Sequence, residues 1–192
     1  LRNKVFDQRQ FNNSCSNITV TSCSFENIHN GDEGAALFVS IMGSFYAKQT
    51  IFSHCSTEYL GGALSCSVSE IVMAYVCCYD CFACASYGSF NTFHAAKIFG
   101  SKLFSLVRIS YCEFTLCPSD KHGFDETVGI WYNCLIKFEA NNFSSNNFGR
   151  DEMFTIWSNS YIKDQVIHCN FGKCSSSQII CTALEIVAES SN

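Results

Sequence analysis

The chain has little charge, a single proline, and no long run of apolar or basic residues. Its 192 residues include 12 Lys and Arg and 17 Asp and Glu, for a formal net charge of −5. Because no basic cluster occurs, the sequence offers no electrostatic footprint for nucleic acid or an anionic membrane surface, and we expect neither partner. No apolar stretch reaches the roughly 18 residues of a membrane-spanning helix, so we expect no transmembrane segment in this chain.

A charged-then-apolar leader is also missing, and the chain begins at Leu1. We therefore expect it to be a processed or excised piece of a longer protein. Apolar residues make up 47% of the chain and charged residues only 15%. That balance supplies a hydrophobic core and is unlike the composition of disordered chains, so the piece should fold, as a single domain.

Helical periodicity is nearly absent. Ala and Leu do not recur at spacings of three and four, and the chain is rich in Phe, Tyr, Val, Ile and Thr, which favour strands. Residues 36–41 and 63–68 share a period-two alternation of apolar residues at matching offsets. Such alternation is typical of strands with one face turned inward. The sequence therefore predicts units of strand, turn and strand.

A six-residue pattern with an aromatic residue or cysteine at its third position occurs six times. The intervals between these central residues are 27, 29, 33, 29 and 28 residues. A near-constant period of this size indicates stacked, identical supersecondary units. The central residues are Phe25, Phe52, Cys81, Phe114, Phe143 and Phe171.

Parallel stacking of such units predicts an all-β protein, a parallel β-helix of about six turns with about 28 residues per turn. Residues 1–14 are polar enough to be an N-terminal cap or an incomplete first turn, and residues 15–192 would form the repeats. Equivalent positions superpose at about 4.8 Å in a parallel stack. The central residues should then form an internal aromatic column, interrupted by Cys81 in the third unit.

The turn after Phe52 is followed, about six residues later, by Gly-Gly-Ala-Leu at residues 61–64, and the turn after Phe25 by a weaker copy at residues 34–37; the later units lack this element. Over roughly residues 15–187 this combination resembles the polymorphic outer membrane protein repeat. The resemblance implies a right-handed parallel β-helix of the pectin-lyase-like kind, as in that family and in related surface proteins of protists. It also implies a role in adhesion.

Fourteen cysteines are present, and three of them, Cys78, Cys81 and Cys84, have the C-x-x-C-x-x-C spacing of iron-sulfur ligands. Such sites use a fourth cysteine a few residues later, and position 88 is Gly. No histidine has zinc-ligand spacing either. We therefore expect no metal and no cofactor.

The cysteines instead recur at positions of the repeat, which predicts stacked ladders. One ladder would contain Cys55, Cys84, Cys117, then Asn146 as an interruption, and Cys174; another would contain Cys23, Cys112 and Cys169. The spacing between turns is compatible with disulfides and equally with free, buried thiols.

Three Asn-x-Ser/Thr tripeptides, at Asn12, Asn17 and Asn142, are candidate glycosylation sites. Together with the cysteine content they favour an extracellular or cell-surface location, because both features belong to the secretory route. The alternative is that these tripeptides arise by chance in a chain rich in Asn and Ser.

An expanded polar loop at residues 118–127 and its counterpart at 150–152 on the next turn should lie side by side at one edge of the stack. Candidate ligand contacts there are Asp120, His122 and Arg150, with Trp131 and Trp157 on the strands that follow; candidate catalytic acids are Asp125, Glu126, Asp151 and Glu152. Such an edge would suit calcium, a sugar polymer or acid-base catalysis. The simpler alternative is solvated loops with core tryptophans. Arg108 is an unusual charge within a strand and is a candidate substrate-binding cation.

These patterns predict a non-enzymatic cell-surface or secreted module that binds a protein or carbohydrate ligand. The alternative is a polysaccharide lyase or glycosidase of the pectin-lyase-like kind, because the fold that the chain resembles includes many such enzymes. A third possibility is a spacer within a longer chain.

Overall fold

The computed structural model contains only strands, turns and irregular segments in the part of the chain that it describes, and its strands pair in parallel. The expectation of an all-β chain with parallel pairing is confirmed. The described residues are 1–12, 17–32, 34–40, 43–58, 61–83, 91–95, 105–115, 128–131, 134–144, 147–148, 154–158, 165–172, 175–176 and 185–188.

Eleven strands form the first sheet. Its main path is β1 (Val5–Phe6), β4 (Ser24–Glu26), β7 (Ser44–Ser53), β10 (Glu70–Tyr79), β13 (Ser105–Ser110), β16 (Cys134–Glu139) and β20 (Gln165–Ile167). Four further strands pair alongside it: β3 (Asn17–Thr21), β14 (Glu113–Thr115), β17 (Asn142–Ser144) and β21 (Asn170–Gly172).

Seven strands form the second sheet. They are β2 (Gln10–Asn12), β6 (Leu37–Ser40), β9 (Leu64–Val68), β12 (Asn91–Ala95), β15 (Val128–Trp131), β19 (Phe154–Ser158) and β23 (Glu185–Ala188). Two small sheets complete the structure: β5 (His29–Asn30), β8 (Ser56–Thr57) and β11 (Phe82–Ala83) in one, β18 (Asn147–Phe148) and β22 (Ser175–Ser176) in the other.

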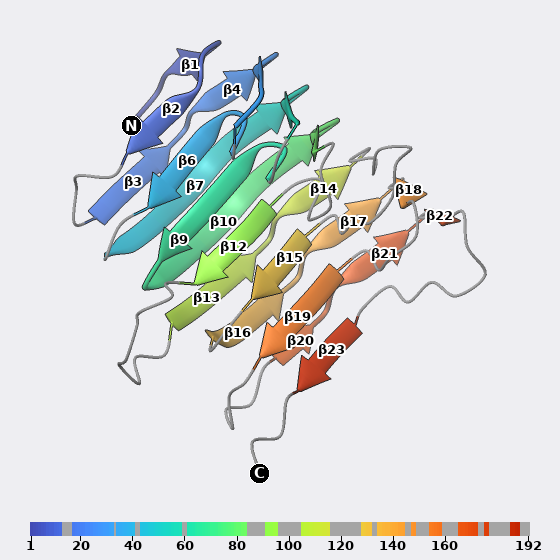
Figure 1. Ribbon diagram of the computed structural model, residues 1–192. Helices are drawn as coiled ribbons and strands as arrows, with labels where there is room; N and C mark the ends of the chain where they lie inside the picture. The colour runs from blue at the N-terminus through green and yellow to red at the C-terminus, as the bar shows by residue number, and fades with distance from the viewer. Residues whose placement is uncertain are drawn as a thin grey trace.

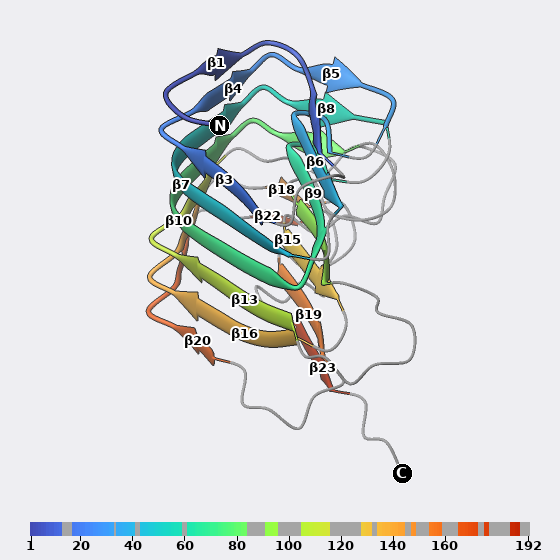
Figure 2. The ribbon, with the colours of Figure 1, turned by 90° about the vertical axis from the view of Figure 1, so that its left-hand side faces the viewer.

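Corresponding strands of successive repeats lie side by side, one step further along the molecule each time, with the two termini at opposite ends (Figure 1). Seen from the side, the sheets surround a common interior (Figure 2). The register pairs Leu37 with Leu64 and Val39 with Cys66, as the alternation predicts. Buried side chains from these sheets form one continuous hydrophobic core.

Residues 1–12, the described part of the expected cap, supply β1 and β2, which pair with β4 and β6. Phe6 stacks on Phe25 with ring centroids 4.8 Å apart. The polar N-terminal segment therefore extends both sheets by one strand and lengthens the internal aromatic stack.

A left-handed residue bends the chain at the same place in every repeat. Seven residues in register have φ between 50° and 56°, and we call them the left-handed column: Asn3, Ser22, Gln49, Tyr75, Tyr111, Ala140 and His168. Backbone bonding continues through the bend, since the Ser22 amide donates to the Lys48 carbonyl and the Ala140 amide to the Ile167 carbonyl. Each strand of the first sheet can thus turn a corner without losing its pairing.

A second bend follows five residues later, at Asn27, His54 and Asp80, whose φ values are 55°, 51° and 50°. Asn, Asp and His are the residues that most readily adopt this conformation after glycine. The His54 amide donates to the Tyr79 carbonyl at 3.0 Å, so this bend too keeps its bonds between repeats.

The glycines of the Gly-Gly-Ala-Leu motif make the third bend. Gly34 and Gly61 have φ of 63° and 70°, and a Cβ on either would lie 2.4 Å from the carbonyl oxygen of Leu37 or Leu64. Only glycine fits there, because a side chain would meet backbone in a conformation that L-residues disfavour.

Most cysteines with described side chains follow a left-handed residue directly, and this explains their recurrence. The thiols of Cys23, Cys55 and Cys112 each donate to the carbonyl two residues earlier, at 3.4, 3.3 and 3.3 Å. Thr50, at the same place in its repeat, does so through its hydroxyl at 3.1 Å. The position takes a buried side chain, Val76 and Ile28 included, and cysteine suits it because it is small and apolar and its thiol can also donate to the nearby carbonyl.

The aromatic column is present, but one of its members is not the residue that the repeat pattern predicted. Phe25 pairs with Phe52 and Phe114 with Phe143, with ring centroids 4.9 and 4.7 Å apart. Between them, Phe52 and Phe114 both pair with Cys78. The residue predicted for this column, Cys81, was therefore the wrong choice.

The two bends explain the shift. Cys78 lies three residues after the bend at Tyr75, as Phe52 lies three after Gln49. Cys81 follows the second bend and lies level with Cys55, because the next residues, Phe82 and Ser56, are partners. Cys81, rather than Cys84, is therefore the neighbour of Cys55 in the ladder.

We expect Phe52→Ala to lower the free energy of unfolding by about 3 to 5 kcal/mol, because the ring is fully buried and stacked. The matched control is Ile51→Ala on the same strand, whose side chain is 47% exposed and should matter by less than about 1 kcal/mol. Chemical denaturation measures both, and equal losses would contradict the register.

Gly61→Ala should cost more than about 2 kcal/mol, through both the left-handed backbone and the collision with Leu64. Gly31→Ala is the control, because an added Cβ there meets only the Glu58 carboxylate at 4.0 Å. Thermal unfolding that is unchanged in Gly61→Ala would disprove this account of the motif.

Candidate ligand-binding face

Most of the loop residues predicted to bind or react lie outside the described residues. These are Asp120, His122, Asp125, Glu126, Arg150, Asp151 and Glu152, together with the ladder residues Cys84, Cys117, Asn146 and Cys174. Apart from the place of Cys84 beside Cys55, which Cys81 takes, their predicted roles remain predictions, and the site developed below is built from described residues alone.

The two tryptophans lie on the second sheet, where β15 places Trp131 directly opposite Trp157 of β19. Two strands earlier their register column contains Ser67, which is half-buried and follows the buried Cys66. In this register Trp131 and Trp157 align with the half-buried Ser67, whereas the buried Cys66 belongs to the neighbouring set of aligned residues.

Arg108 lies on the first sheet, away from the tryptophans. It is exposed on β13, with Val72 of β10 on one side and Lys137 of β16 on the other. Two cationic residues, Arg108 and Lys137, are thus in register on adjacent strands, one strand spacing of about 4.8 Å apart along the sheet. Lys137 forms an ion pair with Glu139 at 2.9 Å.

Glu70 lies on β10, the strand next to β13, and belongs to the same polar face as Arg108 and Lys137. Its carboxylate accepts hydrogen bonds from the hydroxyls of Tyr46 at 2.6 Å and Ser44 at 2.9 Å. Hydrogen bonds from Tyr46 and Ser44 hold the pKa of Glu70 below its ordinary value; burial opposes them, and the positive charge of Arg108 adds a smaller lowering effect. Glu70 is therefore a stable anion that orients Tyr46.

Among the residues whose side chains are described, the most exposed aromatic ones lie at the first bend. Tyr75 and Tyr111 are stacked with ring centroids 5.2 Å apart and an interplanar angle of 9°, and they are 55% and 51% exposed. We call them the tyrosine pair. Both are left-handed residues, an unusual conformation for a bulky side chain that costs on the order of 1 to 3 kcal/mol. The left-handed backbone serves the bend, but the exposure of the two rings adds nothing to the core.

The asparagines of all three candidate glycosylation sites lie in strands. Asn17 is exposed, and its Oδ1 accepts from the Ser44 amide at 3.0 Å. Asn142 is half-buried, and its Oδ1 accepts from Asn170 Nδ2 at 2.9 Å. Asn12 ends β2. Glycosylation at these residues stays a prediction.

The cysteines with described side chains are free thiols, and no group of three or more potential ligands gathers around a metal position among the described residues. A hydrogen bond with Cys81 lowers the pKa of Cys55, although burial opposes it. Burial raises the pKa of Cys112 to about 12. That thiol is held protonated and is poorly suited to nucleophilic chemistry.

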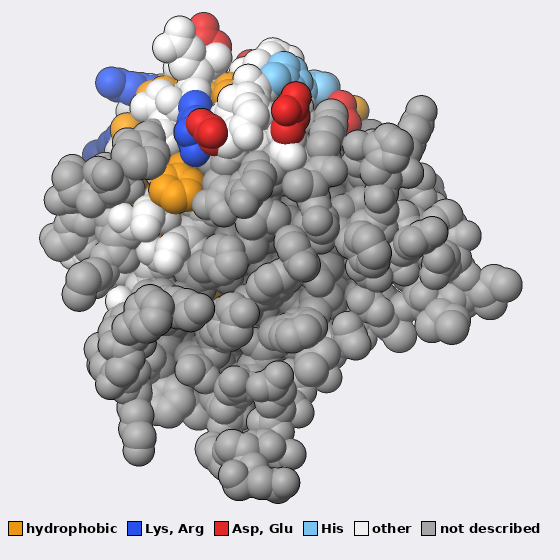
Figure 3. Space-filling view, in the orientation of Figure 1, with side chains coloured by type: hydrophobic (Ala, Val, Ile, Leu, Met, Phe, Trp, Pro, Cys, Tyr) orange, Lys and Arg blue, Asp and Glu red, His pale blue; other side chains and the backbone are white. Residues whose placement is uncertain are grey.

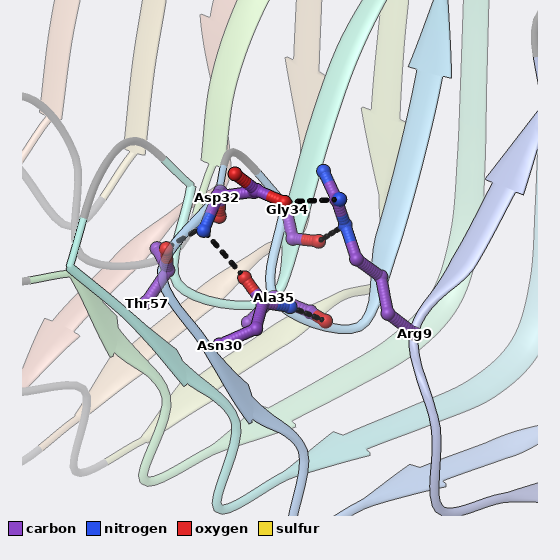
Figure 4. A network of polar contacts seen from close by, with 6 residues as sticks. All are labelled: Arg9, Asn30, Asp32, Gly34, Ala35 and Thr57. Carbon is purple, nitrogen blue, oxygen red and sulfur yellow. Dashed lines mark hydrogen bonds and ion pairs between the residues drawn. The ribbon is translucent and has the colours of Figure 1, made fainter.

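A polar network closes the loop before β6 (Figure 4). Arg9 bonds the Asp32 carboxylate at 3.0 Å and the Gly34 carbonyl at 3.2 Å, and Asn30 donates to the Ala35 carbonyl at 2.7 Å. These hydrogen bonds join side chains of Arg9 and Asn30 to the loop itself, so the network holds the loop in place. Positively and negatively charged side chains lie together near the N-terminal strands (Figure 3). This mixture favours neither an anionic nor a cationic ligand.

Comparison with known protein families, with curated proteins and with solved structures finds no match for this chain. Its described part has no apolar helix of membrane-spanning length. The candidate site therefore rests on geometry: the tyrosine pair beside the outer face formed by Tyr46, Glu70, Arg108 and Lys137.

Sequence reasoning identified Arg108 but missed the tyrosine pair. Tyr75 and Tyr111 are 36 residues apart, the difference of their numbers, and this interval is well above the repeat length of about 28. The signal that would have found them is their place three residues before the central column residues, Cys78 and Phe114. That signal depends on placing Cys78, rather than Cys81, in the column.

We expect Tyr46→Phe to raise the pKa of Glu70 toward its ordinary value, because the largest of the stabilising hydrogen bonds is removed. A depressed carboxyl pKa stabilises the fold above the unfolded-state pKa, and this contribution is lost as pH falls through the folded-state value. Carboxyl carbon shifts followed by NMR titration measure the change. Tyr79→Phe is the control and should leave the Glu70 titration unaltered.

Proposed function

We propose that the chain is a right-handed parallel β-helix of about six turns, part of a secreted or cell-surface protein, and that it binds a carbohydrate ligand without catalysis. Parallel pairing at repeat intervals supports this architecture, as do the recurring first bend and the second and third bends described in the N-terminal repeats. The likeness of the Gly-Gly-Ala-Leu turn to the polymorphic outer membrane protein repeat supports a surface role.

The observation that carries the proposal is the tyrosine pair, two stacked rings that are 55% and 51% exposed. The left-handed backbone at these residues belongs to the bend found in the other repeats too, whereas the exposed ring surface is available to a ligand. Aromatic rings bounded by a few fixed polar groups are typical of ligand sites. Here the polar groups are Tyr46, Arg108 and Lys137, on the outer face of the strands that precede the bend.

The state of the carboxylates on this face favours binding over catalysis. A general acid needs a raised pKa, whereas the pKa of Glu70 is lowered and Glu139 is paired with Lys137. Both side chains are engaged in bonds that fix their neighbours. They suit a face whose task is recognition.

The test is incubation of the protein with acidic and neutral polysaccharides, with and without calcium, while both retention on the polymer and release of reducing or unsaturated ends are measured. We expect retention without release. Replacing both tyrosines with alanine should weaken retention about tenfold or more, whereas Tyr79→Ala, an exposed tyrosine outside the pair, should not.

Two results would contradict the proposal. Absence of retention on every polymer would exclude carbohydrate binding. Release that disappears in Asp125→Asn or Glu152→Gln would instead establish the lyase or glycosidase alternative and place the reaction on the loops.

A further inference from the structure

Two buried thiols of neighbouring repeats meet at the second bend. Cys55 and Cys81 directly follow the left-handed residues His54 and Asp80, and they are level with each other because β8 and β11 pair in register immediately after them. Both side chains are fully buried. In this structure both are free thiols, and a hydrogen bond joins them. The two sulfur atoms are therefore in contact across the boundary between repeats.

This pair is unique among the cysteines whose side chains are described, because no other two of them are neighbours in the register. Cys112, for example, is flanked by a valine on one strand and an asparagine on the other. On its other side Cys55 lies level with Ile28, which has no sulfur. Within the described part of the chain, Cys55 thus has one candidate partner, Cys81.

The geometry of the pair suits a disulfide. In-register residues of adjacent parallel strands are about 4.8 Å apart, and a disulfide accepts Cα separations of about 4.4 to 6.8 Å. The preceding bends are alike, with φ of 51° at His54 and 50° at Asp80. The thiol of Cys55 donates to the carbonyl two residues earlier at 3.3 Å, and that of Cys81 does the same at 3.4 Å. Both side chains therefore leave the backbone in the same direction, and a bridge requires rotation of the thiols toward each other.

A bridge here would strengthen a weakly paired part of the stack. The ladder between β8 and β11 consists of two residue pairs, so it contributes few hydrogen bonds. Cys55 and Cys81 are 26 residues apart, the difference of their numbers. A cross-link that closes a loop of this length restricts the unfolded chain and thereby stabilises the folded one.

We propose that Cys55 and Cys81 form a disulfide that joins the second and third repeats when the chain folds in an oxidising compartment. Because both side chains are fully buried in the folded chain, the bond forms during folding, while the thiols are still accessible. This inference does not depend on carbohydrate binding.

The oxidant is an external disulfide of low molecular weight, such as oxidised glutathione. The thiolate of one cysteine attacks a sulfur of this disulfide, which releases one glutathione thiolate and leaves a mixed disulfide. The thiolate of the other cysteine then attacks the protein sulfur and releases the second glutathione. Two protein thiols are oxidised, one external disulfide is reduced to two thiols, and the two protons of the protein thiols pass to the released glutathione.

The experiment compares the full chain refolded in a buffer of reduced and oxidised glutathione with the chain refolded in a reducing agent. Such a buffer lets bridges exchange until the most stable one remains. Free thiols are then blocked with N-ethylmaleimide. Cleavage at Glu58, Glu70 and Asp80 puts Cys55 and Cys81 on different peptides, and mass spectrometry identifies the bridge between them. Protein exported to the bacterial periplasm during expression is a second sample that needs no refolding.

We expect a peptide pair bridged between Cys55 and Cys81, and a midpoint of thermal unfolding about 5 to 15 °C higher than in the reduced protein. Cys81→Ser should remove both the bridge and this difference, and its hydroxyl keeps a donor at the position, as Thr50 has one at the first bend. Cys112→Ser is the matched control, because Cys112 makes the same bond to a carbonyl but has no cysteine beside it. That variant should keep both the bridge and the difference.

Unbridged thiols at Cys55 and Cys81 in both samples overturn the inference. A bridge from Cys81 to Cys78, three residues earlier, also overturns it, as does one to Cys117, a member of the predicted ladder that lies outside the described residues. Equal unfolding midpoints of oxidised and reduced protein would contradict the stabilising role of the bond. None of these results alters the outcome of the polysaccharide test, so the two proposals can fail separately.

Discussion

The structure depends on bends that the chain makes without losing its hydrogen bonds. At the first two bends one residue takes a left-handed conformation, and its amide still donates to the next repeat, as Ser22 does to Lys48 and His54 to Tyr79. Because buried donors without partners are costly, a chain that turns at every repeat must keep this ladder continuous. Conformational strain at a few positions is the smaller cost.

The bends also account for the cysteine content. A residue that follows a bend faces the interior in little space, and its side chain can donate to the carbonyl two residues earlier. Cysteine meets these needs at Cys23, Cys55 and Cys112, and threonine does so at Thr50. Buried Asn141 satisfies its polar atoms by bonding Cys112 and Ile109. The described cysteines at these positions are unbridged, and their recurrence follows from packing at the bends.

The same register that stacks phenylalanines inside stacks tyrosines outside. Inward residues such as Phe114 and Phe143 are excluded from water, and their stacking adds to the hydrophobic stabilisation. Outward residues at the bend gain far less from burial, so an exposed ring there is available to a ligand. A parallel stack thus converts sequence periodicity into evenly spaced surface positions, and the spacing suits flat rings.

The sequence by itself determined the class of structure and the positions of most strands. Alternation at residues 36–41 and 63–68 and a period near 28 were enough, because inward positions must be apolar in every repeat. The Gly-Gly-Ala-Leu motif could be seen, although its reason, the contact between a Cβ at Gly61 and the Leu64 carbonyl, appears only in three dimensions.

Tertiary structure alone decided the register of the third repeat. Two cysteines three residues apart, Cys78 and Cys81, are equally small and apolar, so composition cannot tell which continues the phenylalanine column. The left-handed residues at Tyr75 and Asp80 settle it, since pairing on both sides fixes the distance from each bend. The tyrosine pair followed from the same register, because a bend is defined by hydrogen bonds between repeats and leaves only a weak trace in the residue types that occupy it.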